Sequence, residues 1–218
     1  MLPISDVIPS RTTPVVTLGL IVLNALIFLY QLALPDPELQ QFVASYALVP
    51  AWFSWPTLFT SQFLHAGWMH VISNMLYLWI FGDNVEERLG HGRFLIFYLV
   101  AGAAAAVLQM LINPFSAVPM VGASGAIAGV MGAYFVLYPQ SRVLTLVFLL
   151  IFVDLVEIPA IFFLGVWFLM QLLSGVGSLG ASNAAGGGTA FWAHIGGFLV
   201  GIFVGFMFRS RPRAWQGY

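Results

Sequence analysis

The sequence predicts an all-α polytopic membrane protein built as a bundle of six transmembrane helices. Of its 218 residues, 61% are hydrophobic and only 7% are charged, whereas an ordinary soluble domain carries roughly 25% charged residues. Several apolar runs also reach the roughly 20 residues that a helix needs to cross a hydrocarbon core about 30 Å thick. Composition and run length together exclude a soluble fold and predict repeated membrane crossings.

The six expected helices follow from the apolar runs in chain order. The first run, Pro14 to Leu34, is longer than the roughly 7–15 residues of a signal-peptide core, and no clear small-residue cleavage site follows it. We therefore expect it to be a retained helix. The six helices are expected near residues 15–34, 62–81, 93–112, 122–138, 158–176 and 190–208.

A further apolar run, at residues 143–153, is short for a crossing and is followed by Asp154, Glu157 and Pro159. Charge decides its interpretation, because the chain has seven Arg and no Lys, and cytoplasmic loops collect positive residues. Six crossings with a cytoplasmic N-terminus put every arginine on the cytoplasmic side, whereas a seventh would move the last three outside. We therefore interpret 143–153 as interfacial, re-entrant or an extension of a neighbouring helix. The arginines are Arg11, Arg88, Arg93, Arg142, Arg209, Arg211 and Arg213.

The domain organisation follows from the same count of crossings. We expect a cytoplasmic N-terminal tail over residues 1–14, one six-helix domain over 15–208 and a cytoplasmic C-terminal tail over 209–218. The outer loop 35–60 is rich in Trp, Phe and Pro, which suits the membrane interface as well as a substrate-handling role. The stretch 175–189 consists almost wholly of small residues, so it could be a lid or a plain linker.

Net charge and cysteine content narrow the chemistry. The formal net charge is −1, which indicates neither a nucleic-acid partner nor a strongly acidic one. The absence of cysteine excludes disulfides, thiolate metal sites and cysteine nucleophiles.

Polar side chains inside lipid-buried helices are functional candidates, because they cost free energy unless they are paired or face a cavity. The second expected helix carries His65, His70 and Asn74, the last two one turn apart on one face. The fourth begins with the motif GASG, which contains Ser124, and the sixth carries His194. All three helices run from outside to inside, so Ser124, His194 and His70 share a depth, and Asn74 lies about 6 Å deeper. We expect them to converge on one cavity in the outer half of the membrane.

These residue types fit nucleophilic catalysis. A serine hydroxyl is a weak nucleophile and needs a base within about 2.6–3.2 Å, and we expect His194 to be that base. His70 is a second candidate base, but its position one turn from Asn74 favours a pair of donors directed at a developing oxyanion. The backbone N–H of Ser124 at a helix N-terminus could supply another donor. No Asp or Glu is expected at this depth, so the sequence supports a dyad rather than a triad.

Glycines explain how the serine and the histidine could meet. Small residues at three- or four-residue spacing let two membrane helices approach closely. Each feature alone has an ordinary explanation, since GxSG is more often a packing face and a single His or Asn more often links helices; their joint placement favours catalysis. The glycines are Gly125, Gly129 and Gly132 in the fourth helix and Gly197, Gly201 and Gly205 in the sixth.

Four motifs, in this order and on these helices, resemble those of the rhomboid intramembrane serine proteases. They are HAGWMHVISN (65–74), VEERLG (85–90), GASG (122–125) and AHIGGFLVG (193–201), and the resemblance covers about residues 60 to 205. It implies Ser124 as the nucleophile, His194 as the general base, and His70 and Asn74 as contributors to the oxyanion hole. The residues with implied supporting roles are His65, Glu86, Gly122, Gly125, Gly197 and Gly201.

The activity implied by the resemblance is cleavage of other membrane proteins within or beside a transmembrane helix, without metal, ATP or another cofactor. The fifth helix and the loop 175–189 resemble the family's substrate gate and cap. Some members have a tyrosine one turn after the serine that packs on the catalytic histidine, and that position here is Ala128. Some also carry a Trp-Arg pair in the first outer loop, and this loop has no arginine.

The hypothesis from the sequence is therefore an intramembrane serine endopeptidase that acts on membrane-protein substrates in a lipid bilayer. We expect a multi-pass protein of a bacterial-type plasma membrane, with both termini cytoplasmic and the active site opening to the outer side. Two alternatives stay open. One is a non-catalytic rhomboid-like binder of transmembrane helices, and the other is a small transporter or channel with a histidine-lined path.

Overall fold

The computed structural model describes residues 2–149, 152–179 and 190–209, and these ranges contain six long helices. They are α1 (Val15–Ala33), α4 (Trp68–Leu89), α5 (His91–Ile112), α6 (Ser124–Leu137), α7 (Ala160–Ser178) and α8 (Phe191–Phe208). Helices α1, α5, α7 and α8 are each long and apolar enough to cross a membrane, and α6 is a shorter apolar helix. The chain is thus a multi-pass helical membrane protein, and the predicted six-helix bundle is confirmed.

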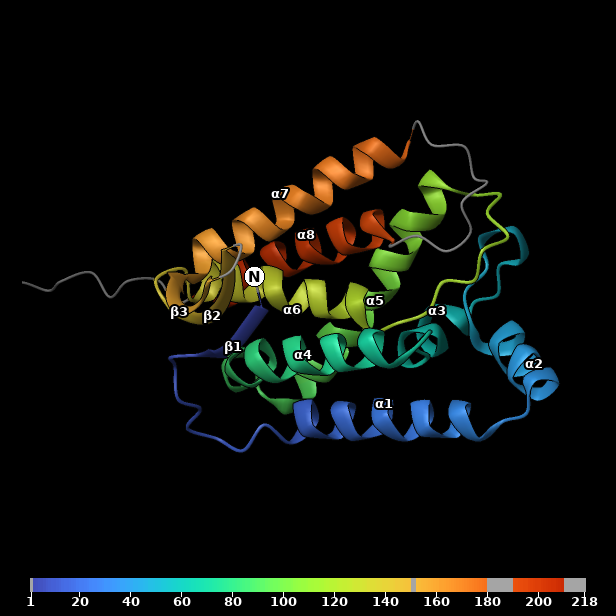
Figure 1. The fold of residues 1–218 in the computed structure, drawn as a ribbon, viewed down its shortest axis with the longest axis horizontal. Coiled ribbons are helices and arrows are strands. Elements are labelled where there is room, and N and C mark those ends of the chain that lie inside the picture. The colour runs from blue at the N-terminus through green and yellow to red at the C-terminus, as the bar shows by residue number, and fades with distance from the viewer. Residues whose placement is uncertain (1, 150–151, 180–189, 210–218) are drawn as a thin grey trace, which may run out of the picture.

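Helix α6 occupies the centre of the bundle. It packs against α4, α5 and α8, while α1 packs on α4 and α7 packs on α8 (Figure 1). Every residue from Gly125 to Tyr134 is buried. A helix that is apolar all round is expected in such a position.

The close contact between α6 and α8 depends on their glycines. A β-carbon added to Gly197 would lie 2.0 Å from the carbonyl oxygen of Gly125, and one added to Gly201 would lie 1.9 Å from that of Gly129. Because these neighbours are backbone atoms, no side-chain movement could make room. The two backbones therefore touch along the glycine faces, as small-residue packing requires.

The described residues of the apolar run 143–153 lie in two antiparallel β-strands, which the sequence analysis did not foresee. Strands β2 (Arg142–Leu149) and β3 (Phe152–Pro159) pair antiparallel, and β1 (Leu2–Asp6) pairs with the other edge of β2. The prediction of a helix extension is wrong, because a continuous apolar run does not by itself distinguish a strand from a helix.

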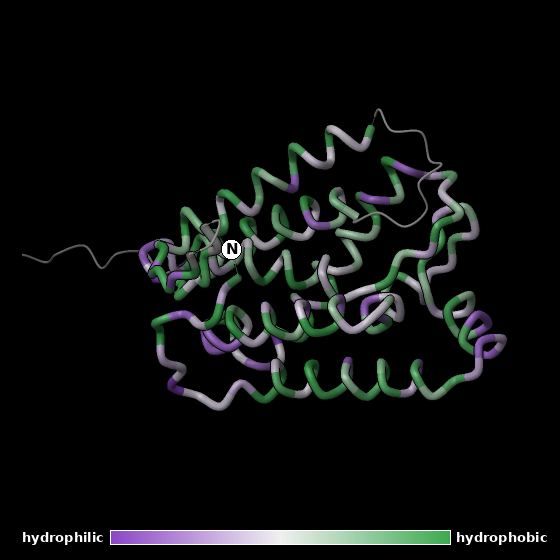
Figure 2. Tube along the Cα trace, viewed as in Figure 1, coloured by the Kyte–Doolittle hydropathy of each residue, from purple (hydrophilic) through white to green (hydrophobic). Residues whose placement is uncertain are grey.

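The sheet lies at the end of the bundle where α1, α5 and α7 begin and where α4, α6 and α8 end, called here the sheet end (Figure 1). Four long helices (α1, α4, α5 and α6) separate β1 from β2, and an even number of crossings returns the chain to the same side. Hydrophilic residues gather at the ends of the bundle and hydrophobic ones along the helices (Figure 2). Arg211 and Arg213 lie outside the described residues; the arginines beside the helix and strand termini at the sheet end are Arg11, Arg88, Arg93, Arg142 and Arg209.

The opposite end, called here the loop end, holds the first outer loop (Figure 1). This loop contains α2 (Asp36–Tyr46), the 3₁₀ turns η1 (Pro50–Trp52) and η2 (Ser61–Phe63), and the short helix α3 (Thr57–Thr60). The second long helix begins at Trp68 rather than near residue 62, because η2 is followed by extended chain up to Gly67. The aromatic character of the loop is displayed outward, since Trp52 and Trp55 are 73% and 74% exposed.

Glu86 anchors the beginning of α1 at the sheet end. Its carboxylate accepts the backbone N–H of Val16 at 2.9 Å and that of Thr17 at 2.7 Å, and His91 Nδ1 lies 2.6 Å from it. The first N–H groups of a helix have no intrahelical partner, and carboxylates are favourable at that end. Glu86, fully buried, is therefore a cap that α4 provides for α1.

Asp6 ties the N-terminal strand to the bundle. The hydroxyl of Tyr134 donates to its carboxylate at 2.6 Å, and Asn84 Nδ2 donates at 3.3 Å. The Tyr134 hydroxyl also lies 2.8 Å from Ser141 Oγ. Burial raises the pKa of the Asp6 carboxyl from 3.8 to about 6; the Tyr134 hydrogen bond opposes this rise and the nearby Asp83 carboxylate adds to it.

Candidate active site

The structure brings Ser124 and His194 into hydrogen-bond contact at the loop end. Ser124 is the first residue of α6 and His194 lies in the first turn of α8. Ser124 Oγ lies 2.8 Å from His194 Nε2, within the range for proton transfer between a nucleophile and its base. Both side chains are half-buried, so the pair is neither sealed in the core nor free in solvent.

Gly122 shapes the space in front of Ser124. Its φ of 121° lies in a region that L side chains rarely adopt. A β-carbon there would lie 2.6 Å from His70 Nε2 and 3.7 Å from Asn74 Nδ2. The chain before α6 thus passes directly over these two side chains, and a residue larger than glycine would collide with the histidine ring.

His70 and Asn74 direct nitrogen atoms toward the same space. His70 Nδ1 accepts the backbone N–H of Ala66 at 3.4 Å, so in the neutral ring the proton resides on Nε2, the atom beside Gly122. Asn74 is buried, and its Nδ2 has no hydrogen-bond partner among the described residues. Two donors on one face of α4 therefore have capacity for an external acceptor.

His65 lies beneath His70. It is buried at 2% exposure, and its ring meets the His70 ring edge to face with the centroids 5.1 Å apart. Its backbone N–H donates to Gln31 Oε1 at 3.0 Å, and Gln31 Nε2 donates to its carbonyl at 3.2 Å. His65 thus packs against His70 while its backbone is fastened to the end of α1.

Two residues of α7 that the sequence analysis missed contact His194. Gln171 Oε1 lies 2.8 Å from His194 Nδ1, and the Trp167 ring lies over the imidazole with centroids 5.8 Å apart. The two residues are one turn apart on one helix face. A glutamine within an apolar crossing is itself a signal, because intramembrane polar residues are functional candidates.

Glu86 does not join this group. It caps α1 at the sheet end, while the site lies at the loop end, where α4, α6 and α8 begin (Figure 1). Most of the expected cap loop, residues 180–189, lies outside the described residues. Within the part of the chain that the structure describes, no three His, Asp or Glu side chains are grouped to hold a metal ion.

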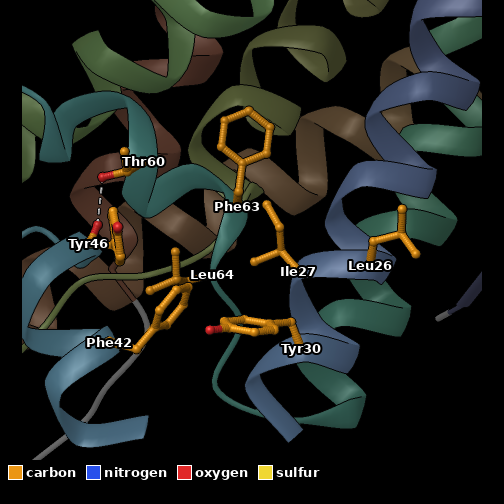
Figure 3. Close-up of a pocket in the computed structure, with 8 residues that line it drawn as sticks. All are labelled: Leu26, Ile27, Tyr30, Phe42, Tyr46, Thr60, Phe63 and Leu64. Carbon is orange, nitrogen blue, oxygen red and sulfur yellow. Dashed lines mark hydrogen bonds between the residues drawn. The ribbon is translucent and has the colours of Figure 1, made fainter. Parts of the chain in front are cut away.

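A separate cavity of about 390 Å³ lies between α1, α2 and the segment before α4 (Figure 3). Its lining is almost entirely carbon and includes no residue of the Ser124 site. The Thr60 hydroxyl is turned to the backbone carbonyl of Tyr46, to which it donates at 2.8 Å (Figure 3). The residues that line the cavity include no serine, histidine, aspartate or glutamate, so it is not the candidate active site. The lining residues are Leu26, Ile27, Tyr30, Phe42, Tyr46, Thr60, Phe63 and Leu64.

Fold and site together define a class: a multi-pass helical membrane protein with a serine and a histidine in contact at the ends of two closely packed helices. Comparison with known proteins gives the family. Residues 53–211 match the Rhomboid domain, and the chain belongs to the rhomboid family.

Relatives come from plants and bacteria. The chain is 32% identical over 171 residues to Rhomboid-like protein 11, chloroplastic, of Arabidopsis thaliana, an alignment that covers 76% of this chain and 55% of that protein. It is 43% identical over 79 residues to Rhomboid protease GluP of Bacillus subtilis, covering 36% of this chain and 15% of that one. With Rhomboid protease GlpG of Salmonella choleraesuis the identity is 29% over 172 residues, covering 73% and 54%. The chain thus spans about half or less of the length of these relatives.

Proposed function

We propose that the chain is an intramembrane serine endopeptidase with Ser124 as nucleophile and His194 as general base. The observation that carries the proposal is the 2.8 Å contact between Ser124 Oγ and His194 Nε2. Family membership supports it, since the relatives GluP and GlpG are rhomboid proteases. A lone serine at a helix end would be an ordinary packing residue; a serine with a base in contact is an activated nucleophile.

The chemistry follows from the contact between Ser124 Oγ and His194 Nε2. Ser124 Oγ attacks the carbonyl carbon of the scissile peptide bond while its proton moves to His194 Nε2. The tetrahedral intermediate collapses, and His194 gives that proton to the leaving amine. Water then attacks the acyl-serine ester, with His194 again taking and returning a proton, and the acid product leaves.

The donors around Gly122 suit the negative charge that develops on the carbonyl oxygen. Asn74 Nδ2 is unpaired within the described chain, and His70 Nε2 lies against Gly122. The backbone N–H of Ser124 begins α6, where amides lack an intrahelical acceptor. We infer that these three groups form the oxyanion hole.

The substrates that we propose are membrane proteins that present a transmembrane helix to the loop end. An intact helix hides its peptide bonds in i to i−4 hydrogen bonds, so a helix that unwinds readily near its end is the expected substrate. The fifth crossing, α7, is the proposed gate, and the loop 175–189 the proposed cap. We propose no metal, cofactor or nucleic acid for this reaction.

The proposed orientation puts both termini in the cytoplasm and the active site on the outer side. Its support is the gathering of arginines at the sheet end, which positive-inside insertion would leave in the cytoplasm. A bacterial-type plasma membrane remains our prediction, as do the boundaries of one protease domain over residues 15–208 between tails 1–14 and 209–218.

Fluorophosphonate labelling of the purified protein in detergent tests the proposal without knowledge of the substrate. We expect the wild type to be labelled and both Ser124→Ala and His194→Ala to lose labelling. Ser73→Ala is the matched control. The Ser73 hydroxyl donates to the Met69 carbonyl at 2.7 Å and should not react with the label, so this variant should be labelled as the wild type is. His91→Gln controls for loss of a histidine at the sheet end.

The outcome separates the two main readings. Labelling that persists in Ser124→Ala would exclude that serine as the nucleophile. A folded wild type that is never labelled, yet binds transmembrane helices, would instead be a non-catalytic rhomboid-like binder.

A further inference from the structure

His194 has a second hydrogen bond, and its partner lies on a third helix. Nε2 faces Ser124 of α6, while Nδ1 lies 2.8 Å from Gln171 Oε1 of α7. One imidazole ring of α8 therefore joins a continuous chain of hydrogen bonds across three helices. Neither the motifs nor family membership assigns a role to Gln171.

The position of the single ring proton decides whether His194 can act as a base. A neutral imidazole has one N–H donor and one bare acceptor nitrogen. To accept the serine proton, Nε2 must be bare, and the proton must reside on Nδ1. That tautomer needs an acceptor at Nδ1, and the side-chain oxygen of Gln171 is one. The reversed amide would turn its NH₂ group to a bare Nδ1 and leave the proton on Nε2, where it blocks catalysis.

The His194 ring packs against a large side chain of α7, whereas α6 offers only a small one. Trp167 lies one turn from Gln171 and covers the imidazole, with the two ring planes 37° apart. On α6, the residue one turn after Ser124 is Ala128, a fully buried methyl against which a β-carbon at Gly197 would sit at 3.3 Å. A larger side chain at 128 would meet the α8 backbone, so the ring is held from α7.

The geometry points to Gln171 as a positioning residue: its side-chain oxygen accepts the Nδ1 proton of His194 and thereby keeps Nε2 bare toward Ser124. This inference rests on the proposed function, because a bare Nε2 matters only if His194 is the base. It adds an orienting group to the dyad without a carboxylate. Such partners of a histidine fix its tautomer and ring orientation.

Two substitutions at Gln171 separate hydrogen bonding from packing. Gln171→Leu removes the acceptor and keeps much of the volume, whereas Gln171→Glu keeps an acceptor oxygen at the same reach. We expect Gln171→Leu to lower kcat on a transmembrane substrate in proteoliposomes by about 10–100-fold, the usual cost of losing an orienting partner. KM should change less than about twofold, and Gln171→Glu should restore most of kcat. Gln171→Met, an unbranched alternative, replaces the leucine variant if that one fails to fold.

Gln109→Leu is the matched control. Gln109 of α5 accepts the backbone N–H of Ala193 at 3.2 Å, one residue before His194, and does not touch the imidazole. It should lower the melting temperature with little change in kcat. A loss of kcat equal to that of Gln171→Leu would show that any loosened contact to α8 suffices, which would overturn the inference.

The tautomer is read directly by ¹⁵N NMR of labelled histidine, with the His194 resonances assigned by their loss in His194→Gln. We expect a protonated Nδ1 and bare Nε2 in the wild type, and a mixture of tautomers in Gln171→Leu. An Nε2-protonated wild type, or unchanged kcat in Gln171→Leu, would overturn the role of Gln171 while leaving the protease proposal intact. A wild type that neither labels nor cleaves would overturn the proposed function, and the inference with it.

Discussion

The two ends of the bundle hold similar polar side chains in opposite hydrogen-bonding states. At the sheet end, both oxygens of Glu86 are bonded, one to Thr17 N and the other to Val16 N and His91. At the loop end, Asn74 Nδ2 is buried without a partner anywhere in the described ranges. Both residues lie on α4.

The difference matches the roles proposed for the two residues: Glu86 is a structural cap, and Asn74 is the proposed oxyanion donor. A buried donor without an acceptor costs about 1–3 kcal/mol, and at Asn74 an acceptor on a bound molecule would offset that cost. The Glu86 carboxylate, with both oxygens bonded inside the protein, has little left to offer a ligand. Hydrogen-bond satisfaction, rather than polarity, therefore separates Glu86 from Asn74.

Asn74→Ala gives the largest effect expected from this comparison. Loss of one oxyanion donor typically lowers kcat by about 10²–10³-fold, and an unpaired amide contributes little to folding. We expect turnover to fall by this factor with the melting temperature unchanged. Asn24→Ala is the control, because Asn24 Nδ2 is already bonded to Leu20 O at 2.8 Å and should affect stability rather than turnover. Unchanged turnover in Asn74→Ala would remove this residue from the oxyanion hole.

Gly201→Ala tests whether the site depends on the α6–α8 contact two turns away. The added methyl would lie 1.9 Å from Gly129 O, which cannot move without moving α6. A shift of about 1 Å at the dyad can cost about 10²-fold in rate, and we expect a loss of this order in fluorophosphonate labelling rate. Gly19→Ala on α1, with nothing within 4 Å, should label as the wild type does. Equal labelling of the two variants would contradict the link between glycine packing and the dyad.

Glu86→Gln should have the opposite effect to Asn74→Ala: it should destabilise the protein and leave the candidate active site unchanged. The amide NH₂ cannot accept, so one N–H at the start of α1 loses its partner, at about 1–3 kcal/mol. We expect lower thermal stability and near-normal labelling of the folded fraction. Glu87→Gln is the neighbouring control, because Glu87 accepts Arg11 N at an exposed position, where changes stay within about 0.5 kcal/mol. Labelling lost in a folded Glu86→Gln would connect the two ends.

Asp6→Asn gives the smallest effect, seen as pH dependence. The pKa of Asp6 is about 6 in the fold, above its ordinary 3.8, so the folded state binds a proton that the unfolded chain has released. The stability that this proton provides is complete below pH 3.8 and is lost as pH rises through about 6. Between pH 3.8 and about 6, the melting temperature should fall less steeply with rising pH in Asp6→Asn than in the wild type. Asp36→Asn, on exposed α2, should keep the wild-type slope.

The sequence was sufficient for the existence of the six long helices because their apolar runs are long and local, but not for every boundary, since α4 spans Trp68–Leu89 and not 62–81. It also predicted that Ser124 and His194 lie near each other, since alternate helices start at the same end of the bundle, and in the structure the two side chains are in contact. It could not give the strands, because a continuous apolar run does not distinguish a strand from a helix, and β2 is recognised only by its pairing with β1 and β3. Gln171 was overlooked for a different reason. Gln171 belongs to none of the four motifs. Only the rotation of α7 about its axis decides whether its side chain meets His194 or lipid.

The pairing of β1 with β2 also constrains the order of assembly. The strand Leu2–Asp6 is made before α1, yet its partner β2 begins at Arg142, after the long helices α1, α4, α5 and α6. At a synthesis rate of about 5–20 residues per second, the first strand waits on the order of ten seconds for its partner to emerge. Contacts of such high sequence separation form slowly. The sheet therefore closes only after the long helices α1, α4, α5 and α6 have been synthesised.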